Sequence, residues 1–390
     1  MKRRTFLVAS TVLPLLCAGG QAFAEPKDFW QRVFLAMPSE FATYANNPEF
    51  KVQILCQYRK KSTRARWKKS AWQLTPKQWF STASVAKLPI ALLACEKIAA
   101  LGLDLSAKIG FSQAPIGGEW PAGELYFESL QRTLTRIFTI SENPPFNRLY
   151  DFLGVNAMNE RLDELGYSTA RLISRMSAPV NDNTRTRAGM VLDANNKPLF
   201  NFVERIGKSR EFAFGEVLVG KGFLKDSGEL FAGPHDFSRA NYISLSDSQQ
   251  MLKAIVDPAS VPKNQRWKIP EPMREQVLKI MAMMPRQSAD PIYPEAEYPD
   301  GYGRFFILGD VKTRKPESLR LIGKVGEAYG YLTDVEYITD NSSEWECLLS
   351  ANIYVNADGI FNDDKYEYET IGYPFLAALG RAVWLIVNTK

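Results

Sequence analysis

A serine and a lysine three residues apart, Ser84 and Lys87, best fit nucleophilic chemistry in this chain. They stand at the head of the apolar run Leu88–Ala94, which predicts a helix. Residues three apart share a helix face, so the lysine amine would reach the serine hydroxyl. That hydroxyl is a weak nucleophile until a neighbouring base takes its proton. Because His235 is the only histidine, the lysine is the better candidate for the base.

The spacing alone is weak support, because Ser260 and Lys263 repeat it. This second copy lies among prolines with no apolar helical run after it, so we interpret it as a loop. His235 falls between Pro234 and Asp236 after a glycine, which also favours a loop. No G-x-S-x-G motif surrounds any serine, which argues against a Ser-His-Asp triad.

Two other polar motifs could complete a site around the serine. The Ser-Glu-Asn sequence at 141–143 follows a predicted helix and precedes two prolines, which predicts a turn with projecting side chains. The Lys-Val-Gly sequence at 324–326 ends a predicted strand that leads through Gly330 into the next one. Each motif by itself is more typical of ordinary structure, the first of a turn and the second of a solvated strand end.

In chain order, the three motifs resemble the S-x-x-K, S-D-N and K-T-G motifs of class A β-lactamases and penicillin-binding proteins. The residues around them are similar to the family too, at 80–83, 146–154 and 331–335. The resemblance covers 50–190 and 318–388, and most of 195–310 has no counterpart. It implies a β-lactamase/transpeptidase-like fold of the α/β (α+β) class and an exported serine hydrolase, closest to class A β-lactamases, that works through an acyl-enzyme.

The resemblance also implies the catalytic roles. Ser84 would attack an amide or ester carbonyl, and Lys87 would accept its proton. Ser141 would relay a proton to the leaving nitrogen. Asn143 would orient Lys87 and hydrogen-bond the substrate amide.

Three further residues would bind the substrate. Lys324 would attract a substrate carboxylate, and its charge would help to lower the pKa of Lys87. Gly326 and Glu327 would form the strand edge beside the nucleophile. The backbone N–H groups of Ser84 and Glu327 would make the oxyanion hole, in which one missing donor costs on the order of a hundredfold in rate.

Three departures from the family pattern affect the expected activity. Glu142 replaces an aspartate, and Val325 replaces a hydroxyl residue that would bind a substrate carboxylate. The loop 175–184 is similar to the Ω-loop of the family, but Ser177 stands where the deacylating glutamate is expected. Asp182 is the nearest carboxylate and is typical of a turn. We therefore expect acylation with slow β-lactam turnover.

Two alternatives remain open within the same set of residues. The first is a D-alanyl-D-alanine carboxypeptidase, or another amide or ester hydrolase with the same Ser-Lys core. The second is a non-catalytic relative that binds the cell wall. Stable labelling of Ser84 by a penicillin would separate the enzymes from the non-catalytic protein.

The pattern of predicted elements supports a mixed fold. We predict one domain over 25–390, with an α/β part over about 25–82 and 311–390 and a mainly helical part over about 83–310, enlarged at 195–310. Strands are predicted at 51–58, 70–74, 319–326, 331–338 and 347–355, and helices at 25–47, 83–101, 128–152, 156–165, 246–256, 271–284 and 370–387. Strands at both ends predict one antiparallel sheet that is flanked by helices.

The first 24 residues have the pattern of a signal peptide. Three basic residues at 2–4 precede an apolar stretch at 6–17 and an Ala-Phe-Ala cleavage site at 22–24. The adjacent arginines are similar to a twin-arginine signal, and an ordinary secretory signal is the alternative. We therefore expect a periplasmic or secreted protein, and no later apolar run that anchors it in a membrane.

The composition limits which classes of binding partner and cofactor are expected. The chain has 48 basic and 43 acidic residues, and three of the basic ones lie in the leader, so nucleic acid is not expected as a partner. Cys56, Cys95, Cys347 and the single histidine form no metal-binding pattern, and we interpret the cysteines as buried. No cofactor or metal is predicted. The expected partner is a small-molecule or peptidoglycan-type substrate, and the oligomeric state stays open.

Overall fold

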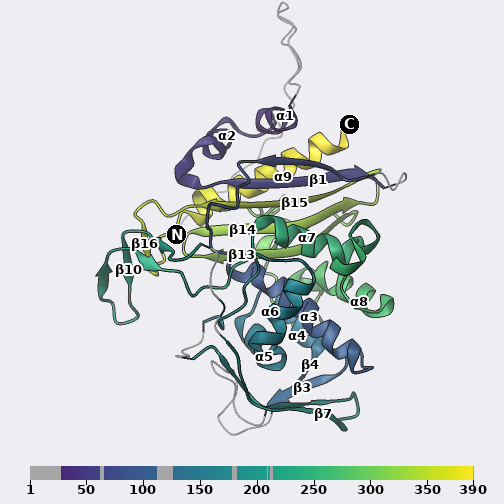
Figure 1. Cartoon of the computed structure of the whole chain (residues 1–390). Helices are drawn as coiled ribbons and strands as arrows, with labels where there is room; N and C mark the ends of the chain where they lie inside the picture. The colour runs from purple at the N-terminus through teal and green to yellow at the C-terminus, as the bar shows by residue number, and fades with distance from the viewer. Residues whose placement is uncertain are drawn as a thin grey trace, which may run out of the picture.

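The centre of the computed structural model, which describes residues 28–61, 66–111, 126–177, 182–208, 210 and 214–389, is a five-stranded sheet. Its order is β13-β14-β15-β1-β2, and every neighbouring pair is antiparallel. The strands are β1 (Gln53–Lys60), β2 (Lys68–Trp72), β13 (Leu319–Ala328), β14 (Tyr331–Asp340) and β15 (Trp345–Tyr354). Both ends of the chain therefore build one sheet, as the sequence predicts (Figure 1).

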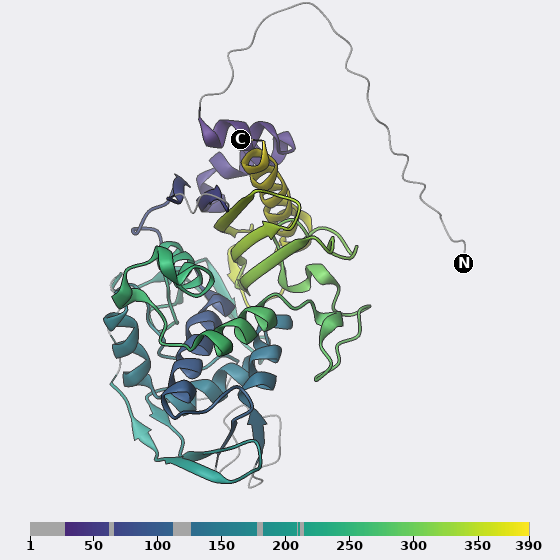
Figure 2. The same ribbon diagram turned by 90° about the vertical axis from the view of Figure 1, so that its right-hand side faces the viewer.

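Helices cover both faces of this sheet. The terminal helices α1 (Phe29–Leu35) and α9 (Tyr373–Asn388) pack together on one face, and α2 (Ser39–Asn46) follows α1. The opposite face packs against α7 (Leu245–Val256), which lies between the sheet and the helical body (Figures 1 and 2). The expected helix at 25–47 is thus two short helices, because Pro38 starts the second one.

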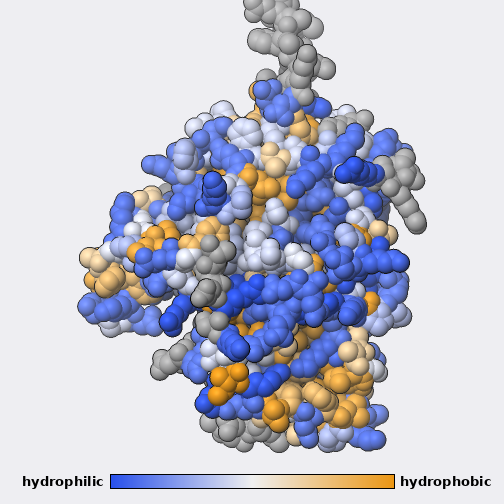
Figure 3. All heavy atoms as spheres, viewed as in Figure 1, coloured by the Kyte–Doolittle hydropathy of each residue, from blue (hydrophilic) through white to orange (hydrophobic). Residues whose placement is uncertain are grey.

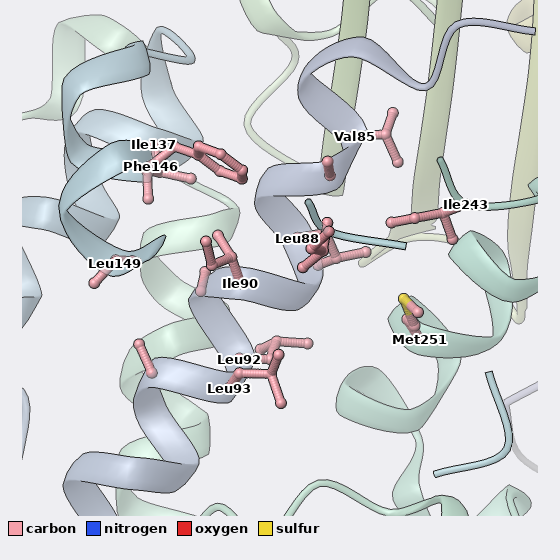
Figure 4. Close-up of a cluster of buried hydrophobic side chains, with 14 of the residues drawn as sticks. Val85, Leu88, Ile90, Leu92, Leu93, Ile137, Phe146, Leu149, Ile243 and Met251 are labelled. Atoms are coloured by element: carbon pink, nitrogen blue, oxygen red, sulfur yellow. The ribbon is translucent and has the colours of Figure 1, made fainter. Parts of the chain in front are cut away.

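The helical body surrounds α3 (Lys87–Ala100). Its other helices are α4 (Leu130–Thr139), α5 (Asn143–Leu153), α6 (Val155–Glu164) and α8 (Glu271–Met281). Figure 4 shows apolar side chains of α3, such as Leu88 and Ile90, among residues of α4, α5 and α7. A helix that is apolar on all sides must be buried. Burial of α3 therefore fixes the position of the residues at its N-terminus.

The middle of the chain is less helical than predicted, because 108–236 also forms small sheets. One sheet has the order β4 (Phe127–Ser129), β3 (Lys108–Phe111), β6 (Gly189–Leu192), β7 (Pro198–Phe202), and β5 (Arg185–Thr186) pairs with β8 (Arg205–Ile206). The others are β11 (Leu230–Ala232), β10 (Gly222–Leu224), β16 (Ile360–Phe361), and β9 (Leu218–Val219) with β12 (His235–Asp236). Strands this short show no readable alternation, so the sequence pattern does not reveal them.

The enlarged segment is joined to the C-terminal part of the chain by β10, which pairs in parallel with β16. The three strands project from the body at the left of Figure 1, where Figure 3 shows apolar surface. Leu230 and Phe231 on β11 are about half exposed, at 52% and 51%. This pairing joins residues 222–224 of the enlarged segment to residues 360–361, which follow β15 of the main sheet.

Single turns of 3-10 or π-helix complete the fold. They are η1 (Pro48–Phe50), η2 (Ala83–Ala86), η3 (Pro258–Ser260), η4 (Lys263–Gln265), η5 (Pro285–Gln287), η6 (Asp300–Gly303) and the π-turn η7 (Tyr368–Gly372). Ser260 and Lys263 fall in two separate turns, so the second serine-lysine pair is not on one helix. Cys56, Cys95 and Cys347, the cysteines of the described residues, are buried, as expected.

The C-terminal helical segment corrects one expectation about apolar runs. Tyr368–Asn388 is long and apolar enough to cross a membrane by length and composition. However, 61% of its most apolar window is buried inside the structure, where α9 packs on β15 and α1. A core helix of this length passes the same test, so the segment is weak support for a membrane span. The predicted signal peptide lies outside the described residues.

Candidate active site

The nucleophile candidate Ser84 lies in η2, immediately before α3. Ala83 before it has a φ of 44°, a left-handed conformation that is rare for alanine. Pro89 is the third residue of α3, where a missing N–H costs no helical hydrogen bond. Ser84 is half-buried and lines a cavity beside this turn. The local sequence thus presents the hydroxyl at a buried helix start.

Lys87 holds the centre of a compact hydrogen-bond cluster. Its Nζ is 2.7 Å from Ser84 Oγ, 2.6 Å from the Ser141 carbonyl oxygen and 2.6 Å from Asn143 Oδ1. The side chain is fully buried. A neutral amine has two N–H groups and one lone pair. The Ser141 carbonyl oxygen and Asn143 Oδ1 can accept hydrogen bonds from the two N–H groups. The lone pair is then free to accept the hydroxyl proton of Ser84.

Burial makes this neutral form accessible. It lowers the pKa of Lys87 from its usual value to about 7, while the nearby carboxylate of Glu142 acts in the opposite direction. A lysine that titrates near neutral pH can accept a proton, unlike an exposed lysine. The geometry and the pKa together suit a general base.

Ser141 lies between the two lysines. Its φ of 64° places the residue in the left-handed region, between α4 and the start of α5. Its Oγ is 3.3 Å from Lys87 Nζ and 2.7 Å from Lys324 Nζ. A hydroxyl in this position can receive a proton from one amine and give it to a leaving group.

Glu142 supports the same turn. Its carboxylate receives hydrogen bonds from Arg136 Nε at 2.9 Å and from Tyr293 Oη at 2.8 Å. The extra methylene of glutamate, compared with the aspartate of the family motif, gives the carboxylate the length for these contacts. Tyr293 belongs to the enlarged segment, and no sequence pattern identified it or Arg136 as part of the site.

Lys324 on β13 is 2% exposed and points at Ser141. Burial and the charge of Lys87 lower its pKa well below the usual value, against the opposing effect of Asp334 and Glu336. Burial also raises the pKa of Asp334, to about 7. These two carboxylates on β14 were missed, although acidic residues at alternate positions of a buried strand are an unusual pattern.

Gly326 brings β13 against the turn that carries the nucleophile. A Cβ atom built on Gly326 would lie 2.6 Å from the Thr82 carbonyl oxygen and 3.2 Å from the Ser84 backbone nitrogen. Only glycine permits this approach. Glu327, one residue further, lines the same cavity as Ser84. An oxyanion hole would need the backbone N–H groups of both residues to point into this cavity.

The structure shows where the residues that depart from the family pattern lie. Asn143 Nδ2 donates to Ser177 Oγ at 2.9 Å, so a hydroxyl occupies the place expected for the deacylating carboxylate. Asp182 accepts from Thr184 at 2.8 Å in an exposed turn and does not line the cavity. Val325 is buried in the core between the sheet and α9. The part of the loop at 178–181 lies outside the described residues.

The cavity beside Ser84 has a volume of about 550 Å³. His235, expected in a loop, is in β12 and lines it. The structure brings every residue predicted for the site together around Ser84, either on the cavity wall or directly behind it: Lys87, Ser141, Asn143, Lys324, Gly326 and Glu327. No group of His, Cys, Asp and Glu suited to a metal ion is found among the described residues.

The fold resembles solved structures of one class. It matches a β-lactamase from Sphaerobacter thermophilus at 14% identity and a TM-score of 0.52, over 93% of this chain and 98% of that chain. PBP-A matches at 11% identity and a TM-score of 0.53, over 93% and 97%. A class A β-lactamase representative from Bacteroides cellulosilyticus matches at 12% identity and a TM-score of 0.52, over 92% and 98%. At these identities the matches show a β-lactamase/transpeptidase-like fold.

The family follows from the sequence match. The profile of the β-lactamase enzyme family (Beta-lactamase2) covers residues 65–345, which is more than half of the chain. The chain therefore belongs to this family, and it is a serine hydrolase of the β-lactamase type. None of the curated proteins compared with the chain matches it.

Proposed function

We propose that this protein is an exported serine acyl-transfer enzyme in which Ser84 is the nucleophile and Lys87 the general base. The observation that carries the proposal is the contact of 2.7 Å between Ser84 Oγ and a buried amine whose pKa is lowered to about 7. Lys87 takes the serine proton, and Ser141 passes a proton to the leaving group. The N–H groups of Ser84 and Glu327 stabilise the oxyanion. Peptidoglycan-type amides and β-lactams are the proposed substrates.

We expect the second step, the hydrolysis of the acyl-enzyme, to be slow. A base must activate the water that releases the acyl group. The family pattern places a carboxylate at position 177, but here Ser177 is present and contacts Asn143. A structural relative, a single-substitution mutant of PBP-A, was solved as an acyl-enzyme complex with penicillin G. A long-lived acyl-enzyme would fit a peptidoglycan carboxypeptidase better than an efficient β-lactamase. A buried Lys87 in this cluster argues against the non-catalytic alternative, because burying an amine is costly.

Intact-mass analysis after incubation with a β-lactam panel tests the proposal. The wild-type protein should gain the mass of one β-lactam and lose it slowly, and Ser84→Ala should gain none. The exposed Ser106→Ala variant is the matched control and should label like the wild type, since Ser106 lies outside the cavity. Labelling of Ser84→Ala, or rapid turnover that leaves no adduct, would contradict the proposal. Detection of the mature chain beginning after Ala24 in the periplasm or medium tests export.

The pH dependence of acylation gives a first prediction. Only the neutral amine of Lys87 accepts the proton of Ser84, so the acylation rate should rise through about pH 7 and level off above it. Because the charge of Glu142 raises the pKa of Lys87, Glu142→Gln should shift this midpoint to lower pH. The measurement is the second-order acylation rate by mass spectrometry from about pH 5 to about pH 9, a range that brackets this titration. A flat profile would mean that Lys87 is not the base.

Ser177→Glu gives a second prediction. A carboxylate at this position can act as a base toward water near the acyl-enzyme, and general base catalysis is worth about 10² or more. We expect the adduct to decay on the order of ten to a hundred times faster, with acylation changed much less. Ser177→Gln has the same length without the charge and should leave the decay unchanged. Equal decay rates of the glutamate and glutamine variants would show that deacylation is not limited by this missing base.

A further inference from the structure

The cavity extends well beyond the nucleophile, along the end of β13. Its outer part is lined by Tyr329 at the end of this strand, by His235 and Phe237 from the enlarged segment, and by Tyr366 and Tyr368 after β16. Of the described residues, Lys87, Ser141 and Lys324 lie behind Ser84 and do not line it. Since Ser141 marks the leaving-group side, the outer cavity receives the acyl part of a substrate.

Aromatic rings form much of this outer cavity, and several are held in place. His235 stacks on Phe223 with ring centroids 4.2 Å apart. The Tyr366 hydroxyl accepts from a backbone N–H at 2.7 Å, and the Tyr368 hydroxyl accepts from another at 2.8 Å. Burial lowers the pKa of His235, against the opposing charge of Asp236, which favours the neutral form of this ring. The walls thus contain aromatic rings that are held in place by stacking and hydrogen bonds.

Carboxylates are interleaved with these rings. Asp236, Glu327 and Asp364 line the cavity, and none of them forms an ion pair with a cation in the described part of the chain. Burial raises the pKa of Tyr366 and Tyr368, and Asp364 is near enough to add to the rise. Two arginines also line the cavity, Arg175 and Arg239.

The balance of charge in this cavity is negative. The Arg175 side chain is fully buried and paired with Asp151, so its charge is already compensated. Arg239 is near enough to help lower the pKa of Asp236, and burial raises the pKa of Glu327, whose carboxylate accepts a hydrogen bond from Tyr373. Asp236 and Asp364 still outnumber this one uncompensated arginine on the cavity wall. A substituent with an additional carboxylate would be repelled by this set. A cation would gain both Coulomb attraction and contact with ring faces, which attract cations through their quadrupoles.

We propose that the outer cavity is a subsite for an ammonium group on the acyl part of the substrate. This inference rests on the proposed function, because the cavity is a substrate site only if Ser84 is the nucleophile. The ammonium lies among the tyrosine faces, with Asp236 and Asp364 as counter-charges. The substrate class is therefore an amide or ester whose acyl chain carries a primary amine several bonds from the scissile carbonyl.

A matched pair of probes tests the subsite. Acylation of 6-aminopenicillanic acid with 6-aminohexanoic acid or with heptanoic acid gives two penicillins of equal side-chain length, and only the first is cationic. We expect the cationic probe to acylate Ser84 about tenfold faster at low ionic strength. Raising the salt to about 0.5 M should shrink this ratio, because salt screens exposed charges.

Variants without the carboxylate charges test whether the preference for the cationic probe comes from this cavity. Asp236→Asn with Asp364→Asn should bring the ratio of the two rates close to one. Asparagine keeps the acceptor that receives the Ser238 N–H at 2.8 Å, and it tolerates the φ of 57° at 364. Glu344→Gln removes an exposed charge at the opposite end of the sheet and should preserve the wild-type ratio.

Three results would overturn the inference. Equal rates for the two probes in the wild type, or a ratio that survives in the Asp236 and Asp364 double variant, would remove the ammonium subsite while leaving the acyl-enzyme mechanism intact. Labelling of Ser84 by neither probe would instead refute the proposed function and the subsite with it.

Discussion

Replacing Lys87 with methionine is expected to lower the acylation rate of Ser84 by about 10³-fold or more, the effect of losing both the base and its hydrogen-bond cluster. Methionine nearly fills the volume of lysine, and it removes a buried amine that costs free energy to bury. The substitution also leaves the Ser141 carbonyl oxygen and Asn143 Oδ1 without this donor, which offsets the gain, so the free energy of unfolding should change little. Time-resolved intact-mass measurements with a penicillin, together with thermal unfolding, provide both readouts.

The matched control for this experiment is Lys97→Met on the same helix. Lys97 is also largely buried, but its Nζ donates to the Phe152 carbonyl oxygen and touches no residue of the site. We expect its acylation rate to stay within about twofold of the wild type, because surface and structural changes outside a site act mainly on stability. Wild-type acylation in the Lys87→Met variant would show that another group deprotonates Ser84.

Gly326→Ala is expected to have the second largest effect, a loss of about 10²-fold or more in acylation. The added Cβ would lie 2.6 Å from the Thr82 carbonyl oxygen and 3.1 Å from the Val85 nitrogen. Both are backbone atoms, so they cannot swing away as a side-chain end does. The strand must move away from the turn, and this would displace the N–H of Glu327 from the N–H of Ser84 in the proposed oxyanion hole.

Gly222→Ala serves as the comparison for this second substitution. Its added Cβ would lie 3.2 Å from a flexible Leu230 side-chain atom and 3.3 Å from the Phe231 backbone oxygen, so a shift of a few tenths of an ångström accommodates it. We expect normal acylation for this variant. A Gly326→Ala protein that melts like the wild type and still acylates at the wild-type rate would exclude an oxyanion hole between 84 and 327.

The sequence determined the large elements of this protein and the membership of the catalytic cluster. Long periodic segments such as α3, and ten-residue strands such as β13, carry enough apolar positions to be recognised. The three polar motifs stood in the order of a known family, so Ser84, Lys87 and Lys324 were predicted together. In the structure, Lys87 Nζ lies 2.7 Å from Ser84 Oγ, and Lys324 Nζ lies 2.7 Å from Ser141 Oγ.

Only the tertiary structure decided what surrounds that cluster. Tyr293, which donates a hydrogen bond to Glu142, belongs to a segment without a recognisable pattern. The strands β10 and β16, which pair with each other, are only three and two residues long. His235 looked like a loop residue and became part of the cavity wall. The physical reason is that such contacts join residues far apart in the chain, and they depend on burial and close packing instead of local periodicity. The pKa of Lys87 follows the same rule, because desolvation exists only once the chain has closed around the amine.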